Sequence, residues 1–120
     1  MNAKELRIGN WVRIKDVPTT NEWQVESIGS LQQVGGQLWS IEELEPIPLT
    51  EEWLERFGFD KDDDGVWELP SVMWSCEIEY GGSMTFKKLG LDILCPDILY
   101  VNQLQNLYFA LSGEELTIKE

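Results

Sequence analysis

One acidic segment has the spacing of a calcium-binding loop. Asp60, Asp62 and Asp64 alternate with other residues, and Gly65 follows them. In loops with this D-x-D-x-D-G pattern the three carboxylates converge on Ca²⁺, because the glycine allows a sharp turn. Glu68, at the ninth position, is the further oxygen ligand within reach. These four residues are therefore the candidate metal ligands of the chain.

The segment departs from the calcium pattern after Glu68. Ser71 stands where the loop needs a bidentate glutamate, Pro70 precedes it, and a strand rather than a helix is expected to follow. Short motifs of this kind are frequent by chance. The sequence therefore favours a solvated acidic turn with weak calcium binding or none, and we expect no cofactor.

Other groups that enzymes use are scarce. The chain has no histidine, the usual general base and commonest metal ligand. No helix is expected after Gly35-Gly36 or Gly81-Gly82, so both pairs are expected to form hairpin turns and not phosphate-binding loops. Cys76 and Cys95 lack CxxC spacing, and buried, reduced thiols are the simplest interpretation. We therefore expect a protein that is not an enzyme.

A partner-binding surface is the other chemistry that the residues suggest. Helical spacing predicts a helix at about 103–112, with an Asn102–Gln105 capping pair at its start and Gly113 after its end. Its apolar arc comprises Val101, Leu104, Leu107, Tyr108 and Leu111. Phe109 falls beside Gln105 and Asn106, away from that arc. Either another part of the chain covers this face, or a partner binds it.

Aromatic residues supply further candidates. Six tryptophans in 120 residues are many for a chain of this size. Large side chains help to fill thin cores, but cores this small cannot bury all six completely. Exposed aromatic residues beside carboxylates are typical of protein interfaces. Trp11 and Trp23 therefore join Phe109, Gln105 and Asn106 as partner-binding candidates.

The elements that position these residues are expected in two groups. Residues 1–48 alternate as short strands, with Gly35-Gly36 as a two-residue hairpin turn and a capped helical turn at Ser40–Glu43. Four strands, one helical turn and a last strand is the order of an SH3-like small β-barrel. We expect a domain boundary just before Leu49.

Residues 49–120 are expected to form an α-β-β-β-α domain, so the fold class is α+β. A helix over 49–59 is predicted by the N-cap Thr50 and by Gly58 at its end. The alternating strands 72–80 and 84–89 should form a hairpin. A three-residue loop that sorts apolar residues together predicts the pairs Tyr80 with Met84, Ile78 with Phe86 and Glu77 with Lys87.

Three stretches together resemble a family of small uncharacterised proteins encoded by prophages and mobile elements of gut bacteria. They are the ELRIGN segment from Glu5, the PIPLTEEWLERFGF segment from Pro46 and the YVNQLQNLYFALSGEEL ending from Tyr100. The resemblance spans both ends and the middle of the chain. It implies a phage or mobile-element origin but no activity. The family pattern has histidine at the position of Asn102, so any role of that imidazole is absent here.

Charge restricts the partners. The chain has 22 acidic and 9 basic residues, a net charge of −13. A phosphate-binding surface needs lysine and arginine, so direct nucleic-acid binding is disfavoured. No apolar run is long enough for a membrane span, and the first residues lack the apolar core of a signal peptide. We expect a soluble protein in the cytoplasm of the bacterial host.

The leading interpretation is a non-enzymatic protein-binding module. One alternative is an acidic nucleic-acid mimic that inhibits a host defence or transcription protein. Another is a minor virion or assembly component. For the charge itself, acidic residues that serve only solubility are the favoured explanation over nucleic-acid mimicry.

Overall fold

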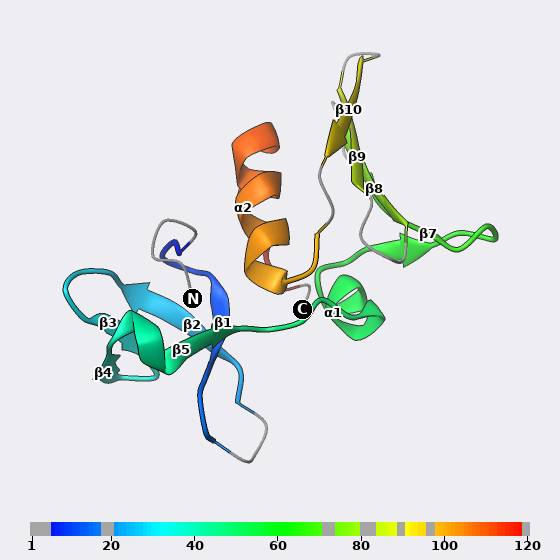
Figure 1. Ribbon diagram of the computed structural model, residues 1–120. Helices are drawn as coiled ribbons and strands as arrows, with labels where there is room; N and C mark the ends of the chain where they lie inside the picture. The colour runs from blue at the N-terminus through cyan, green and yellow to red at the C-terminus, as the bar shows by residue number, and fades with distance from the viewer. Residues whose placement is uncertain are drawn as a thin grey trace. The chain divides into compact units, whose positions relative to one another are not determined.

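The computed structural model describes residues 6–17, 21–70, 74–79, 84–88, 91–95 and 98–118 (Figure 1). The protein is α+β, with two antiparallel sheets and two helices. It divides into two compact units, one of residues 1–48 and 100–107 and the other of residues 49–99 and 108–120. The division falls before Leu49, but the first half of the last helix groups with the N-terminal unit. The expected assignment of all of 49–120 to one domain therefore differs from the observed units.

The N-terminal unit contains a five-stranded sheet in the order β4-β3-β2-β1-β5 (Figure 1). Its strands are β1 (Trp11–Ile14), β2 (Trp23–Ser27), β3 (Gln32–Val34), β4 (Gln37–Trp39) and β5 (Leu44–Pro46). One turn of 3₁₀ helix, Ile41–Glu43, connects β4 to β5. Among the described residues no ladder joins the two edge strands β4 and β5, so the sheet is open where a closed barrel was expected. Each of these edge strands has only three residues, which limits the hydrogen bonds that closure would provide.

Alternating apolar residues make the core of this sheet. Val12 and Ile14 of β1 are buried, and Ile14 pairs with the buried Leu44 of β5. Val25 and Val34 face each other across β2 and β3. Leu6 completes the buried cluster, against which Trp39 and Ile41 pack.

The two-residue hairpin turn predicted at Gly35-Gly36 is confirmed. Val34 pairs with Gln37, and the two glycines have φ angles of 60° and 78°. Side chains with a Cβ adopt such angles at a cost, so glycine suits both positions.

Helix α1 (Glu51–Arg56) begins as predicted at Thr50. The Thr50 hydroxyl accepts the Trp53 N–H at 3.4 Å, and Gly58, with a φ of 92°, follows the end of the helix. The helix itself is shorter than the predicted 49–59. It contributes Trp53 and Leu54 to the core of the second unit.

The second unit contains another five-stranded antiparallel sheet, in the order β10-β9-β8-β7-β6. Figure 1 labels β7 to β10. Its strands are β6 (Asp60–Lys61), β7 (Val66–Pro70), β8 (Trp74–Glu79), β9 (Met84–Lys88) and β10 (Leu91–Cys95). The predicted α-β-β-β-α order has fewer strands than this sheet. The short β6 was missed because two residues are too few to show alternation.

The predicted register between β8 and β9 is wrong by two residues. Ile78 pairs with Met84 and Glu77 with Thr85, in place of Phe86 and Lys87; Tyr80 lies outside the described residues. A slip of two keeps every side chain on its predicted face, because side chains alternate with a period of two. The Lys87 ammonium still lies 3.3 Å from the Glu77 carboxylate.

Helix α2 (Val101–Ser112) begins two residues earlier than predicted. The capping amide is Gln103, whose Oε1 accepts the Tyr100 N–H at 3.2 Å, and not Gln105. The predicted end is confirmed, because Gly113 has a φ of 75° and its N–H donates to the Phe109 carbonyl at 2.8 Å. Neither described helix is long and apolar enough to span a membrane.

Candidate partner-binding site

Gln105, a predicted partner-binding residue, lies inside the N-terminal unit. Only 1% of it is exposed. Its Oε1 accepts the backbone N–H of Trp11 at 2.9 Å, and its Nε2 donates to the Gly9 carbonyl at 3.1 Å. Both ends of the amide are thus used within the chain, and Gln105 holds α2 against residues 9–11. Of the two alternatives left open for this face, cover by another part of the chain is the one observed at Gln105.

Asn106 takes part in the same contact. Its Oδ1 accepts hydrogen bonds from Asn10 Nδ2 at 2.9 Å and from an Arg7 guanidinium N–H at 3.1 Å. Asn10, itself 1% exposed, accepts the Arg7 backbone N–H at 2.6 Å. We call this set the amide junction; it comprises Arg7, Gly9, Asn10, Trp11, Gln105 and Asn106. The junction brings together the two ends of the chain that carry the family resemblance.

Trp23 keeps the exposure expected of a contact residue, 42%. Its indole N–H donates to Asn21 Oδ1, and Asn21 in turn donates to the Ile14 carbonyl. The ring also lies against the β3–β4 turn, where a Cβ added at Gly35 would come within 3.0 Å of it. The indole is therefore oriented by the protein while part of its surface remains open. Trp11, by contrast, is half-buried at the amide junction.

Phe109 belongs to the second unit and is 40% exposed. It follows Gln105 by four residues in α2, yet the two side chains differ completely in exposure. Phe109 therefore retains accessible aromatic surface in the second half of the helix. Asn102, where the family pattern has histidine, is buried, and its Oδ1 has no hydrogen-bond partner among the described residues.

The acidic segment forms a turn between β6 and β7. The Asp62 Oδ1 accepts the N–H groups of Asp64 and Val66, each at 2.9 Å. Asp60 and Glu68 are cross-strand partners on β6 and β7, while Asp62 and Asp64 are exposed. In the part of the chain that the structure describes, no three histidine, cysteine, aspartate or glutamate residues are grouped to hold a metal ion. Asp62 thus stabilises the turn by accepting its backbone donors.

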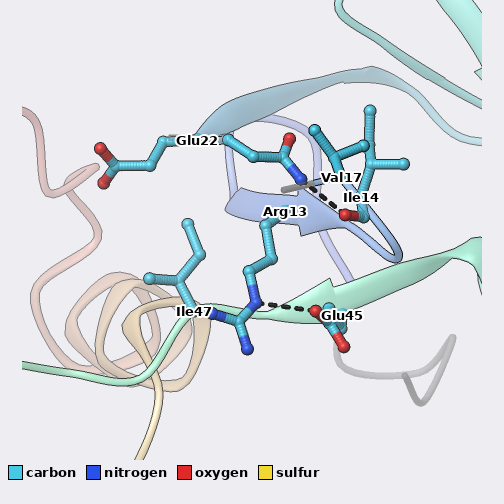
Figure 2. Close-up of a pocket in the computed structure, with 7 residues that line it drawn as sticks. Arg13, Ile14, Val17, Glu22, Glu45 and Ile47 are labelled. Carbon is cyan, nitrogen blue, oxygen red and sulfur yellow. Dashed lines mark hydrogen bonds and ion pairs between the residues drawn. The ribbon is translucent and has the colours of Figure 1, made fainter. Parts of the chain in front are cut away.

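A cleft of about 310 Å³ lies in the N-terminal unit (Figure 2). Asn21, which accepts the Trp23 indole N–H, is one of the residues that line it. Its apolar walls are Ile14 of β1, Val17 and Ile47. Ile14 and Ile47 are almost fully buried, whereas Val17 is 42% exposed. The cleft therefore has a fixed apolar floor and an accessible apolar edge.

Charged side chains surround this apolar surface. Figure 2 shows the Arg13 guanidinium turned toward Glu45, whose Oε1 accepts the Arg13 Nε–H at 2.8 Å. Glu22 also lines the cleft. Asn21, which is buried, fixes the loop before β2 through its bond to the Ile14 carbonyl. The arrangement suits recognition of an apolar group with polar or charged neighbours.

The sequence singles out Trp23 but contains no sign of this cleft. Arg13 and Glu45 carry opposite charges, but the sequence alone contains no sign that they pair. Their pairing depends on β5 adding to β1, across 32 residues of chain. Alternation within each strand carries no information about that pairing.

Of the two cysteines, Cys95 is the one whose side chain the structure describes. It lies on β10 with its Sγ 3.7 Å from the Ile93 carbonyl. Burial raises the pKa of this thiol, and a hydrogen bond with the Phe86 backbone partly offsets the effect. A thiol held in its protonated form is a poor nucleophile. The geometry therefore gives no support to cysteine chemistry at this position.

Comparisons with known proteins complete the description of the site. No protein-family model, curated protein or solved structure matches the chain. The resemblance to prophage and mobile-element proteins therefore stays an expectation from the three sequence segments.

Proposed function

We propose that this protein is a non-enzymatic protein-binding module of a phage or mobile element, acting in the cytoplasm of the bacterial host. Its N-terminal unit receives an apolar side chain of the partner protein. The observation that carries the proposal is the cleft of Figure 2, with its apolar walls and charged rim. Concave apolar surface with a few fixed polar groups is the usual form of a binding site.

The walls of the cleft supply the affinity in this proposal. Val17 is the accessible member, and a partner side chain that covers it also contacts Ile14 and Ile47. Removing apolar surface from water contributes about 25 cal/mol per Å². The asparagine that anchors the loop before β2 holds this surface ready before the partner arrives, which lowers the entropic cost of binding.

The rim supplies specificity. The side chains of Arg13 and Glu45 are 44% and 34% exposed, so their mutual ion pair contributes little to stability and can be shared with a partner. Because the protein carries a net charge of −13, a partner with a basic surface is favoured over one with an acidic surface. The same charge disfavours nucleic acid as the direct ligand.

The proposal includes an SH3-like class for the N-terminal unit. The strand order β4-β3-β2-β1-β5 and the 3₁₀ turn between β4 and β5 support it. In this topology β5 adds to the free edge of β1, and that addition is what brings Glu45 and Ile47 to the cleft. Fold class alone does not establish function, so the cleft carries the proposal.

Site-specific photocrosslinking tests the proposal. A benzophenone amino acid is placed at Val17 in the cleft or, as a control, at Leu38, which is 63% exposed on β4 and does not line the cleft. In lysate of a gut-bacterial host, the expected result is one discrete crosslinked protein from position 17 and none from position 38. Adding the unlabelled wild-type protein in excess should abolish the crosslink, whereas Val17→Asp protein should not. Equal crosslinking from both positions, or competition by Val17→Asp, would contradict a partner site in the cleft.

A further inference from the structure

The second unit contains its own cleft, of about 340 Å³, formed by α1 and the β6–β7 hairpin. The residues that matter to its chemistry are Glu51, Glu55, Phe59, Asp60, Lys61 and Trp67. Phe59 and Trp67 are almost fully buried and provide an aromatic floor. None of these residues lines the cleft of Figure 2.

Negative charge dominates this second cleft. Glu51 and Glu55 are four residues apart on α1, which places them on one face of the helix, and Asp60 joins them from β6. Among the described residues that line the cleft, Lys61 is the single cation. Its ammonium lies 3.8 Å from Glu51, and both side chains are more than two-fifths exposed. Such a pair is held weakly, so most of the negative charge remains available to another cation.

Trp67 provides an observation independent of the carboxylates. Only 3% of it is exposed, and its indole Nε1–H has no hydrogen-bond acceptor among the residues that the structure describes. A buried donor without an acceptor is costly and calls for an explanation. The Lys61 ammonium lies over the same ring, 6.0 Å from its centroid. The aromatic face of the cleft therefore already accommodates an ammonium group, at the distance of a cation–π contact.

We propose that this cleft binds a lysine- or arginine-bearing segment of a partner protein. The cationic side chain displaces Lys61, lies over the Trp67 ring and pairs with Glu51, Glu55 and Asp60. A carbonyl oxygen of the same segment accepts the Trp67 indole N–H. A polypeptide supplies both groups, whereas a free polyamine supplies only the charge. The proposal rests on the protein-binding function proposed above and names the chemistry of its partner.

Lys61 acts in this proposal as an internal competitor. Because it occupies the position that the ligand cation takes, removing its charge frees the ring and adds one unit of net negative charge to the cleft. Lys61→Gln should therefore bind a basic peptide more tightly. The residue is exposed, so this variant is expected to fold normally.

The test uses the purified full chain and a fluorescein-labelled tetra-arginine peptide with blocked ends, with anisotropy measured at fixed ionic strength. Glu51→Gln/Glu55→Gln/Asp60→Asn should weaken binding about tenfold, since it removes three nearby charges. The control Asp16→Asn/Glu42→Gln/Glu114→Gln makes the same change in net charge at exposed residues outside both clefts. It should weaken binding by less than about threefold, because none of these three carboxylates lines the cleft and salt screens exposed charges that make no direct contact with the ligand. Equal weakening by both triple variants, or no tightening by Lys61→Gln, would overturn the proposal.

A second arm tests the hydrogen bond and the class of ligand. Trp67→Phe keeps an aromatic ring but removes the indole N–H, so it should weaken tetra-arginine binding. It should weaken spermine binding less than peptide binding, because spermine carries the same charge without a carbonyl and loses only part of its contact with the ring. If spermine binds wild type as tightly as the peptide does, the cleft is a general polycation site and the polypeptide assignment fails. Since synthetic probes replace the partner, these outcomes do not depend on the crosslinking result at Val17.

Discussion

Gln105 accepts the backbone N–H of Trp11 at 2.9 Å, although 94 positions separate the two residues in the chain. The same amide donates to the Gly9 carbonyl. Through Gln105, the first half of α2 is joined to the start of β1 by hydrogen bonds to backbone atoms. The identity of residues 9 and 11 matters little to these bonds, but that of residue 105 matters greatly.

We predict that Gln105→Met destabilises the protein by about 1–3 kcal/mol. Methionine has a similar length but leaves the Trp11 N–H without its acceptor in a buried position. Urea unfolding followed by circular dichroism measures the effect. Gln37→Met, at an exposed residue of β4, is the matched control and should change stability by less than about 0.5 kcal/mol. Equal effects at the two positions would show that the amide junction contributes nothing specific.

The Gly35-Gly36 turn offers a paired test of the contact with Trp23. Gly36→Ala meets no atom within 4 Å, so only its positive φ opposes the substitution, at about 1–2 kcal/mol. Gly35→Ala incurs the same backbone cost and also pushes against the Trp23 ring. It should therefore destabilise the protein further, by about 1 kcal/mol or more. Thermal melts of both variants measure this difference in stability. When Trp23→Ala is added to each variant, the difference between them should disappear.

Phe109 and its neighbour Tyr108 differ in exposure, 40% against 5%. Phe109→Ala should cost about 1–2 kcal/mol, because much of the ring is already in water. Tyr108→Ala should cost about 3–5 kcal/mol, as expected for a large buried aromatic residue. Denaturant titration of the two variants gives the comparison. A loss at Phe109 as large as that at Tyr108 would remove Phe109 from the partner-binding candidates.

Calcium should bind the acidic turn at roughly millimolar affinity or not at all. The Asp62 carboxylate accepts two backbone N–H groups through one oxygen, and the remaining carboxylates are not grouped as ligands among the described residues. Calorimetric titration with CaCl₂ measures the affinity, with Asp62→Asn as the variant that keeps an acceptor oxygen in the turn. Micromolar binding by the wild type that Asp62→Asn abolishes would show that the turn is a calcium site.

Short-range features followed from the sequence because all their atoms lie within a few residues. The Thr50 cap depends on Trp53, the end of α2 depends on Gly113 and Phe109, and the β3–β4 turn depends on its two glycines. Each is decided by local backbone geometry. The choice between strand and helix followed equally well from hydrophobic periodicity.

The register between β8 and β9 could not be predicted from the residues around the turn that connects them. Alternation on β8 and β9 determines which side chains share a face, but registers that differ by two residues satisfy it equally. The observed pairing of Ile78 with Met84 follows from contacts along the whole sheet, including the pairing of β8 with β7.

Only the tertiary structure shows that the polar candidates Gln105 and Asn106 form hydrogen bonds within the chain. A helical wheel places Gln105 and Asn106 away from the apolar arc, but it contains no information about donors and acceptors elsewhere in the chain. Arg7, Asn10 and the backbone of residues 9–11 supply those groups, and a satisfied amide can be buried at little cost. The cleft of Figure 2 likewise exists only because β5 adds to β1 and the loop before β2 is held by Asn21. Its walls come from segments that are far apart in the sequence. They are brought together by tertiary packing, which the spacing of residues within one segment does not reveal.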